Sequence, residues 1–252
     1  MKKIKSYKQF IKESESFDYN DMIDYTLLEE DSTNEDIKEL CEKANKLGVK
    51  SVCVLPKFVK LATNCLADSK VLVCTVVSFP GGDNSLDEKI SETKKVIADG
   101  ADEVDMVLNY KMLQLDGETS KEYLVEEVKS LADICHDNVN KDSEKVILKV
   151  IVESGLLTNE ETKISTHVCI EAGADFIKTS TGKVAVGAEM DKIQTMFDTI
   201  KSEGSSMNIK ASGGIRTAEQ ITSMIGTVDR FGMGFGSVDK INGIISDVES
   251  SY

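Results

Sequence analysis

The sequence predicts a single-domain α/β protein, a (β/α)8 barrel with the TIM-barrel architecture. From residue 17 onward, strand-like and helix-like segments alternate eight times, and no strong linker interrupts them. The chain of 252 residues is long enough for one barrel around one core. A doubly wound open sheet is the alternative architecture, but no G-x-G-x-x-G turn follows the first strand.

Residues 1–16 form an N-terminal extension, and we expect the barrel to occupy residues 17–252. Four apolar residues of the extension recur at helical spacing, with lysines between them: Ile4, Tyr7, Phe10 and Ile11. The pattern is typical of a weakly amphipathic helix that docks on a partner or on the barrel, and a frayed tail is the other interpretation. Glutamates argue against an organelle transit peptide, and the lack of an apolar core argues against a signal peptide.

The first half of the predicted barrel contains four strands and the helices that follow them. The strands are residues 22–27, 51–55, 71–79 and 103–108. Thr33 and Asp36 resemble a capping box at the start of the first helix, and Gly48 ends that helix. Pro56 suits the start of the second helix. The third helix is residues 86–98, and the fourth is clearest at 123–136.

The second half repeats this alternation up to the C-terminus. The strands are residues 146–152, 176–179, 208–211 and 230–233. The helices are residues 159–172, 190–201, 218–225 and 238–248. Near-continuous apolar runs, clearest at 71–79, are typical of strands that are buried on both faces.

Composition excludes several classes of protein. The net charge is −14 and no lysine–arginine cluster offsets it, so we expect no nucleic-acid partner. The sequence has no apolar stretch of about 18 residues, so we expect no membrane span. The six cysteines form no C-x-x-C pair, which predicts buried free thiols in a reducing cytoplasm. His136 and His167 lie in predicted helices, so we expect neither a His-rich zinc site nor a Ser-His-Asp triad.

Four charged residues lie within apolar stretches of neighbouring strands: Asp105, Lys149, Lys178 and Lys210. Each lysine alone is compatible with an edge position, from which its amine reaches water. Together the four residues occupy consecutive strands, which lie about 4.8 Å apart in a sheet. If they point inward at similar heights, three amines and one carboxylate meet near the strand ends where barrel enzymes place their reactive groups.

Such a cluster has a chemical use. A free lysine, with a pKa of about 10.4, is almost entirely protonated at neutral pH. Burial and a second ammonium group both disfavour the charged form and lower the pKa. Lys178 is therefore the candidate nucleophile for a carbonyl group, and a nearby carboxylate is suited to proton transfer during Schiff-base formation.

Three glycine-containing segments follow the last three strands. They are Thr179-Ser-Thr-Gly-Lys183, Ser212-Gly-Gly-Ile-Arg-Thr217 and Gly232-Met-Gly-Phe-Gly-Ser237. Glycines let backbone N–H groups converge on an anion, and the start of the next helix adds positive potential. Loops seven and eight are the usual phosphate site of such barrels. Each segment alone indicates little, but together with Lys183 and Arg216 they predict a phosphate-binding site.

Four motifs together resemble the deoxyribose-phosphate aldolase family. They are Glu103-Val-Asp-Met-Val107, Leu148-Lys-Val-Ile-Val-Glu153, Asp175-Phe-Ile-Lys-Thr-Ser-Thr-Gly-Lys183 and Lys210-Ala-Ser-Gly-Gly-Ile-Arg-Thr217. The resemblance runs from about residue 21 to residue 239. It implies a metal-independent class I aldolase, a lyase without a cofactor. Its reaction is the reversible cleavage of 2-deoxy-D-ribose 5-phosphate to D-glyceraldehyde 3-phosphate and acetaldehyde, a step of deoxyribonucleotide catabolism.

The resemblance also implies roles for individual residues. Lys178 is the Schiff-base lysine, and Lys210 is the second lysine, which lowers the pKa of Lys178 and helps proton transfer. Asp105 is the acid/base partner and works with an ordered water. Asp24 matches an aspartate near the substrate hydroxyls, and Lys149 matches an interior lysine that is not the nucleophile. The other expected substrate-binding residues are Thr179, Gly182, Lys183, Gly213, Gly214, Arg216, Gly234, Gly236 and Ser237.

One departure from the family pattern concerns the last strand. Family members commonly follow Arg-Phe/Ile-Gly with a serine-rich turn that binds phosphate, whereas here Arg230-Phe-Gly continues as Met233-Gly-Phe-Gly-Ser237. The departure puts phosphate affinity or substrate preference in doubt. Three other functions therefore stay open: a Schiff-base aldolase with a different aldehyde acceptor, a non-catalytic phosphosugar-binding barrel, and a scaffold that depends on the extension. We expect a small phosphorylated sugar and acetaldehyde as partners, and a cytoplasmic homo-oligomer (dimer or tetramer).

Overall fold

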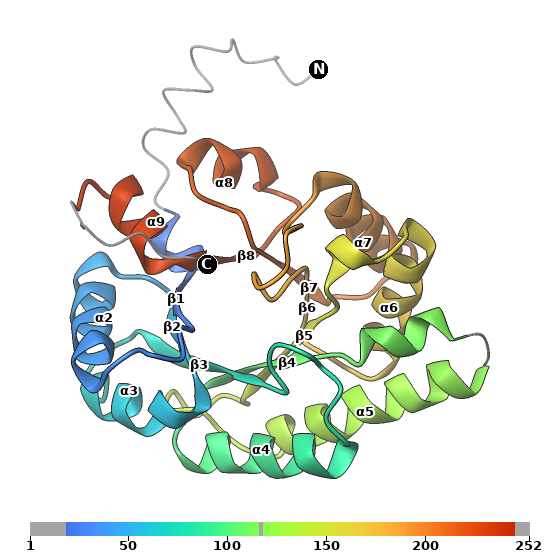
Figure 1. Cartoon of the computed structure of the whole chain (residues 1–252), viewed down its shortest axis with the longest axis horizontal. Helices are drawn as coiled ribbons and strands as arrows, with labels where there is room; N and C mark the ends of the chain where they lie inside the picture. The colour runs from blue at the N-terminus through green and yellow to red at the C-terminus, as the bar shows by residue number, and fades with distance from the viewer. Residues whose placement is uncertain (1–18, 116–117, 245–252) are drawn as a thin grey trace.

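The chain folds into a closed barrel of eight parallel strands (Figure 1). A computed structural model describes residues 19–115 and 118–244, so the predicted extension at 1–16 lies outside the described residues. Each strand is hydrogen-bonded to the next in chain order, and β8 returns to pair with β1. This closure confirms the predicted fold class and excludes the open doubly wound sheet.

The strands match their predicted positions to within two residues at each end. They are β1 Ile23–Leu27, β2 Ser51–Val54, β3 Leu72–Val77, β4 Glu103–Val107, β5 Ile147–Ile151, β6 Phe176–Lys178, β7 Asn208–Ser212 and β8 Arg230–Gly234. Nearly every strand residue is buried, because side chains fill the barrel interior and helices cover its outside.

Helices form a ring around the strands (Figure 1). They are α2 Asn34–Leu47, α3 Val59–Cys65, α4 Leu86–Ala98, α5 Glu118–His136, α6 Asn159–Glu171, α7 Met190–Ser202, α8 Ala218–Met224 and α9 Phe235–Ile241. Short 3-10 turns precede three of them: η2 Pro56–Phe58, η3 Tyr110–Gln114 and η4 Ser154–Leu156. A further 3-10 turn, η1 Asn20–Met22, precedes β1.

Local sequence signals explain where the helices begin and end. The predicted capping box of Thr33 and Asp36 is present at the start of α2, and Gly48 ends this helix in the left-handed conformation with a φ of 66°. Helices α4, α6 and α8 begin with capping boxes of the same kind. These reciprocal bonds satisfy backbone donors that the first helical turn would otherwise leave without partners.

The position of the last helix differs from the prediction of 238–248, of which residues 245–248 lie outside the described residues. Helix α9 begins at Phe235, directly after the last residue of β8, and ends at Ile241. Gly243 adopts a φ of 72°, and its N–H donates to the carbonyl of Lys240, while the N–H of Ile244 donates to the carbonyl of Asp239. This pair of bonds is the Schellman motif, which stops a helix.

The apolar core lies between the strands and the helical ring. The six cysteines are free thiols, and five of them are buried as predicted, whereas Cys65 on α3 is exposed. The prediction was wrong for Cys65 because this residue lies at the solvent-facing end of a short helix. Among the described helices, none is long and apolar enough to cross a membrane.

Candidate active site

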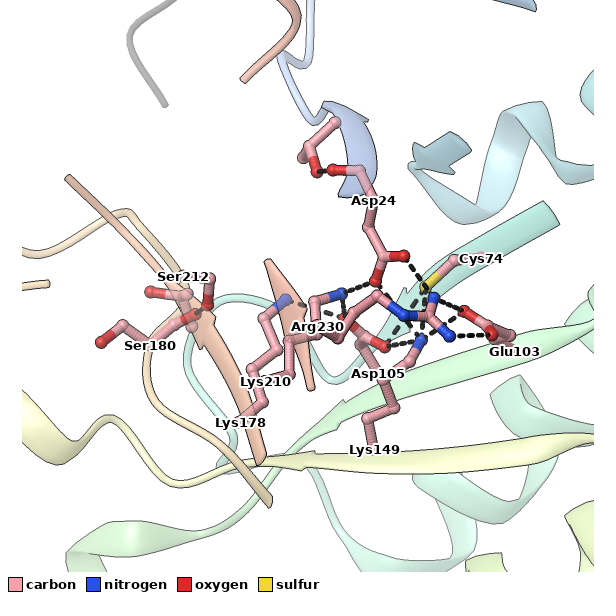
Figure 2. Close-up of polar contacts among 12 residues, drawn as sticks. Asp24, Cys74, Glu103, Asp105, Lys149, Lys178, Ser180, Lys210, Ser212 and Arg230 are labelled. Atoms are coloured by element: carbon pink, nitrogen blue, oxygen red, sulfur yellow. Dashed lines mark hydrogen bonds and ion pairs between the residues drawn. The ribbon is translucent and has the colours of Figure 1, made fainter. Parts of the chain in front are cut away.

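Charged side chains meet in the centre of the barrel around Asp105 of β4 (Figure 2). The Oδ2 atom of Asp105 accepts hydrogen bonds from the Nζ atoms of Lys178, at 2.8 Å, and Lys210, at 2.6 Å. Its Oδ1 atom accepts one from the Nζ of Lys149 at 2.9 Å. All four side chains are fully buried. The structure therefore contains the cluster of three amines and one carboxylate that the sequence predicts.

The strand register explains why these side chains meet. Lys178 pairs with Lys210 on the next strand, and Lys210 pairs with Arg230 on the strand after that. On the other side of the cluster, Asp105 pairs with Lys149. Register partners on adjacent parallel strands lie about 4.8 Å apart and point to the same face. Here that face is the barrel interior, so charges from neighbouring strands converge.

Two further charged residues complete the cluster, and the sequence analysis did not include either of them. The guanidinium of Arg230 donates to Asp24 Oδ1 at 2.5 Å and to both oxygens of Glu103 at 3.2 Å. Glu103 also accepts a hydrogen bond of 2.6 Å from Lys149. A signal for Glu103 was present, because it lies two residues before Asp105 and therefore faces the same side of β4.

Asp24 of β1 lies at the edge of the cluster nearest β8 (Figure 2). Its carboxylate pairs with the ammonium of Lys210 and with Arg230, and it accepts a hydrogen bond of 2.7 Å from the hydroxyl of Ser51. Asp24 is thus in the same cluster as the predicted catalytic residues. A substrate hydroxyl that approaches Lys210 would also come close to this carboxylate.

The cluster holds one more cation than anions. Its cations are Lys149, Lys178, Lys210 and Arg230, and its carboxylates are Asp24, Glu103 and Asp105. An arginine does not lose its proton in a protein, so any loss of a proton must come from a lysine. Because an uncompensated charge is costly in a buried site, the excess favours one neutral amine.

Charge coupling shifts the acidities of the carboxylates. Burial alone would raise the pKa of Asp105, but the ammonium groups of Lys149, Lys178 and Lys210 outweigh burial and hold this pKa well below its usual range. Burial also acts to raise the pKa of Asp24, but the cations, Arg230 foremost, lower it. Both carboxylates are therefore ionised at neutral pH and attract positive charge.

The lysines on either side of the cluster are held in their charged forms. Burial acts to lower the pKa of Lys210, but Asp105 and Asp24 raise it well above its usual value. For Lys149, burial is again opposed by Asp105, and the pKa is raised. Lys149 donates to three acceptors, the third being the Sγ of Cys74 at 3.3 Å. Lys149 is thus a fixed charge and not a free nucleophile.

Gly232 in β8 makes room for Lys210. A Cβ atom at this position would lie 3.1 Å from the Cε of Lys210 and 2.9 Å from the Cβ of Ser212. Its backbone has no positive φ, so the requirement for glycine comes from packing and not from conformation. Gly232 lies in the predicted strand 230–233 and also begins the glycine-containing segment that was predicted to bind phosphate; the structure confirms its place in the strand, next to Lys210.

The segments after β6 and β7 pack directly on one another. A Cβ at Gly187 would lie 2.2 Å from the carbonyl oxygen of Gly213, and a Cβ at Gly213 would lie 3.6 Å from the Cα of Gly182. The hydroxyl of Ser212 donates to the carbonyl of Ser180 at 2.6 Å. The structure therefore brings the predicted residues Gly182, Gly213 and Gly214 to one rim, and it adds Gly187.

The side-chain hydroxyl of one serine at this rim is a candidate group for binding water or a ligand. The hydroxyl of Ser180 is buried and has no hydrogen-bond partner among the residues that the structure describes. Gly213 and Gly214 next to it adopt φ values of 85° and 77°, which favour glycine and orient their N–H groups differently from those of a strand. A buried hydroxyl of this kind is usually satisfied by water or a ligand.

The cations predicted at the rim are less well placed than the glycines. The Nζ of Lys183 pairs with Glu29 of the β1–α2 loop at 3.3 Å. Arg216 is exposed, and its N–H, like that of Thr217, donates to the side chain of Gln220 at the start of α8. A phosphate would have to compete with Glu29 for Lys183.

Thr179 has a structural role that the sequence analysis did not predict. Its hydroxyl donates to the carbonyl of Ser212 at 3.0 Å and accepts from the N–H of Ser212 at 2.9 Å, so it ties the ends of β6 and β7 together. Nearby, the carboxylate of Glu153 accepts from the hydroxyl and the N–H of Thr181. These contacts fix the segment that follows Lys178.

The glycine-rich stretch after strand eight is not a loop. Gly232 and Gly234 lie in β8, and Gly236 and Ser237 lie in the first turn of α9. Backbone N–H groups at the start of this helix replace the predicted loop as possible phosphate donors. The loop prediction failed because glycine signals a turn in many sequences, whereas here Gly234 ends the strand and Gly236 lies in the first turn of the helix.

Two groups of side chains in this cluster have the composition of a metal site: Cys53, Cys74 and Asp105, and Asp24, Cys74 and Glu103. Their carboxylates already accept hydrogen bonds from ammonium or guanidinium groups. A divalent cation would have to displace these cations and add charge to a cluster in which cations already outnumber anions. The donor set therefore favours a metal-independent site.

Comparisons with known proteins agree with this geometry. Residues 21–237 match the model of the DeoC/LacD family of aldolases. The deoxyribose-phosphate aldolase of Mycoplasmoides pirum is 42% identical over 207 residues, which are 82% of this chain and 89% of that protein. The enzyme of the same name from Caldicellulosiruptor saccharolyticus is 43% identical over 203 residues, which are 81% and 87%.

A solved structure extends the agreement to the fold. The tetrameric deoxyribose phosphate aldolase of Aeropyrum pernix superposes with a TM-score of 0.78 at 26% identity, and the match covers 97% of this chain and 100% of that one. The buried lysine–carboxylate cluster, the family match over most of the chain and relatives above 40% identity lead to one conclusion. This chain belongs to the DeoC/LacD family of aldolases.

Proposed function

We propose that the protein reversibly cleaves 2-deoxy-D-ribose 5-phosphate to D-glyceraldehyde 3-phosphate and acetaldehyde, the activity for which its relatives are named. The observation that carries the proposal is the contact of two lysines, Lys178 and Lys210, with one oxygen of Asp105. An amine, a neighbouring ammonium and a shared carboxylate are the groups that class I aldolase chemistry needs.

Lys178 is the nucleophile in this mechanism. Its neutral Nζ attacks the C1 aldehyde of the open-chain sugar, and loss of water gives an iminium ion. A base removes the proton of the C3 hydroxyl, the C2–C3 bond breaks, and its electron pair passes to the iminium as an enamine. C3 becomes the aldehyde of glyceraldehyde 3-phosphate. Protonation of C2 and hydrolysis of the imine release acetaldehyde and restore the amine.

Lys210 and Asp105 support these steps. The charge of Lys210, stabilised by Asp105 and Asp24, stays close to Lys178 and favours the neutral amine there. Asp105, with a hydrogen bond of 2.8 Å to Lys178, is placed to pass protons to and from the carbinolamine through an ordered water. The ionised carboxylate also stabilises the positive iminium.

The rim of the barrel binds the rest of the substrate in this proposal. Asp24 accepts a hydrogen bond from a sugar hydroxyl. The phosphate lies against the N–H groups of the segments after β6 and β7 and of the first turn of α9. The residues that we assign to this binding are Lys149 at its base and, at the rim, Thr179, Gly182, Lys183, Gly213, Gly214, Arg216, Gly234, Gly236 and Ser237.

The remaining expectations are part of the proposal. We place the catalytic unit at residues 17–252 and treat 1–16 as an addition to it, so deletion of 1–16 should leave turnover unchanged. A homo-oligomer is supported by the tetrameric relative. A reducing compartment such as the cytoplasm is supported by five buried free thiols. No metal or cofactor takes part, and activity should survive excess chelator.

Borohydride trapping with 2-deoxyribose 5-phosphate tests the chemistry and the nucleophile together. Reduction of the Schiff base fixes the substrate carbons to one lysine. Trypsin does not cut after a lysine that carries an alkyl group, so an adduct on Lys178 should replace the peptide 164–178 by a modified peptide 164–183. The Lys178→Ala protein, treated in parallel, should show no adduct.

The other outcomes separate the alternatives. An adduct at a different lysine, or none in a protein that still binds the sugar phosphate, would refute the assignment and favour a non-catalytic binding barrel. An adduct with acetaldehyde but none with the sugar phosphate would favour a Schiff-base aldolase with another acceptor. The absence of a serine-rich turn after β8 makes this second candidate worth testing.

A further inference from the structure

Two cysteines face each other inside the barrel, next to the charged cluster. Cys53 of β2 and Cys74 of β3 are register partners on adjacent strands, and both are fully buried. Their sulfur atoms and a carboxylate oxygen of Asp105 all lie within 4.8 Å of one another. Cys53 and Cys74 thus form a pair of thiols in contact with the catalytic carboxylate candidate.

Cys74 is bonded into the cluster (Figure 2). Its Sγ donates to Asp105 Oδ1 at 3.2 Å and accepts from Lys149 Nζ at 3.3 Å. Asp105 Oδ1 is thereby shared between a thiol and an ammonium group. A change at this sulfur would alter the position and charge of the carboxylate that holds Lys178 and Lys210 on its other oxygen.

We propose that Cys53 and Cys74 form an oxidant-sensitive dithiol that closes to a disulfide and inactivates the enzyme reversibly. The effect on turnover rests on the proposed function, so the experiment that tests this proposal also detects the disulfide directly. The proposed use of these residues is separate from the aldolase reaction, which needs neither sulfur.

The backbone geometry permits this bond. Register partners in a parallel sheet have Cα atoms about 4.8 Å apart, within the range of roughly 4.4–6.8 Å that disulfides span. The sulfur atoms must approach to bonding distance by side-chain rotation, because the strands of a closed barrel cannot move apart or together freely.

The chemistry balances with hydrogen peroxide as the oxidant. The thiolate of one cysteine attacks an oxygen of the peroxide, the O–O bond breaks, and a sulfenic acid and water form. The second thiol then displaces water from the sulfenic sulfur, and the S–S bond forms. Each disulfide consumes one peroxide and releases two waters. A small dithiol such as dithiothreitol reverses the reaction by thiol–disulfide exchange.

The surroundings assign the two roles. The neighbouring Cys74 side chain is the largest cause that lowers the pKa of Cys53, and the ammonium of Lys210 acts in the same direction. Burial raises the pKa of Cys74, and the bond to Cys53 and the charge of Asp105 add to this shift. Because the Cys74 thiol also donates its proton to the carboxylate of Asp105, we assign the first oxidation to Cys53 and the resolving step to Cys74.

Access does not prevent the reaction. Lys178 is as fully buried as the two cysteines, yet a substrate aldehyde must reach it. Hydrogen peroxide is uncharged and close to water in size, so it can follow the same route. Formation of the disulfide removes the S–H donor to Asp105 and the acceptor for Lys149. Loss of hydrogen bonds to charged groups of this kind lowers activity by about tenfold or more.

Peptide mapping of the full chain after peroxide treatment tests the proposal. Trypsin puts Cys53 in peptide 51–57 and Cys74 in peptide 71–89, so the disulfide joins these two peptides. We expect the intact protein to lose the mass of two hydrogens, turnover to fall, and dithiothreitol to restore both. Cys53→Ala and Cys74→Ala proteins, each compared with its own untreated sample, should keep their remaining turnover after the same treatment.

A second cysteine pair provides the control. Cys41 on α2 and Cys65 on α3 also lie within hydrogen-bond reach, and Cys65 is exposed. The Cys65→Ser protein should be inactivated by peroxide like the wild type. A disulfide between peptides 39–43 and 61–70 alone, or sulfinic acid at Cys53 without a crosslink, would overturn the proposal. These chemical results hold even if the aldolase assay with deoxyribose 5-phosphate shows no turnover.

Discussion

Lys89 and the lysines of the central cluster are all fully buried, but their surroundings are opposite. Lys89 of α4 lies outside the strands and is fully buried. It donates to the carbonyls of Gly82 and Val107 at 2.7 and 2.9 Å and to the carboxylate of Glu127 at 2.8 Å. One cation faces one anion, and each of the three ammonium protons has an acceptor. The ammonium of Lys89 is therefore fully hydrogen-bonded and held in one position.

The central cluster is built differently. Lys178 and Lys210 share one oxygen of Asp105, and cations outnumber carboxylates. A buried lysine is therefore no sign of catalysis by itself. The distinguishing features are shared acceptors and excess positive charge, because these favour the loss of a proton that a nucleophilic amine requires. At Lys89 burial lowers the pKa and the carboxylate of Glu127 opposes this shift without reversing it, so Lys89 differs from the central cluster in its acceptors and its charge balance.

The largest expected effect is that of Lys178→Ala on turnover. Removal of the nucleophile should lower kcat by about 10⁴-fold or more. The same change leaves three cations for three carboxylates, so we expect no loss of thermal stability. Steady-state kinetics and a melting curve on the same sample check both statements. Turnover close to that of the wild type would show that Lys178 is not the nucleophile. The central cluster would then not differ from Lys89 in the way argued above.

The next effect is that of Lys210→Leu. Loss of the neighbouring charge favours the ammonium form of Lys178 and removes a proton-transfer group, so kcat should fall by about 10²- to 10³-fold. Lys210→Arg keeps the positive charge but changes the shape of the side chain. It should therefore still favour the neutral amine of Lys178, but it should not restore proton transfer. The pH dependence of kcat should therefore shift to higher pH in Lys210→Leu and not in Lys210→Arg. Equal profiles would contradict the electrostatic role.

Lys89→Met should affect stability and not chemistry. It leaves the carboxylate of Glu127 buried without its cation, which costs about 3 kcal/mol of unfolding free energy. The double change Lys89→Met/Glu127→Gln should recover most of this loss, since Gln still accepts the hydrogen bond that the N–H of Asn109 donates to Glu127. Chemical denaturation measures the stability, and turnover per folded molecule should change only a few-fold. A large fall in kcat would mean that Lys89 also contributes to the chemistry and would contradict its contrast with Lys178.

Sequence patterns predicted the central cluster but not the buried pair of Lys89 and Glu127. Asp105, Lys149, Lys178 and Lys210 interrupt apolar strands, where a charge has no ordinary place, so their alternation with apolar residues predicts the cluster. Glu103 and Arg230 begin their strands, where charged residues are common, and the pattern cannot separate an inward from a solvent-facing side chain there.

Lys89 and Glu127 could not be predicted for a different reason. They lie on two helices, 38 residues apart in the chain, and charged residues on helices usually face solvent. Only the packing of α4 against α5 buries them together. The start of α9 at Phe235 was also beyond the pattern, because glycines after a strand look the same in sequence whether they form a loop or open a helix. Local sequence signals therefore predict the helices and strands, whereas contacts between these elements decide which charged side chains are buried together.

The smallest expected effect lies at the rim, where Glu29 pairs with Lys183 at 3.3 Å. Both side chains are partly exposed, and such pairs contribute about 1 kcal/mol or less. Glu29→Gln removes the charge that competes with phosphate for Lys183, so the KM for deoxyribose 5-phosphate should fall by about two- to fivefold with kcat unchanged. Glu30→Gln, next in the chain and paired with Lys57 at 3.7 Å, is the matched control and should change neither. Unphosphorylated deoxyribose should respond to neither variant, because the rim charge acts on the phosphate alone. A parallel change in KM for both sugars would mean that Glu29 shapes the loop, and Lys183 would then lose its place in the phosphate site.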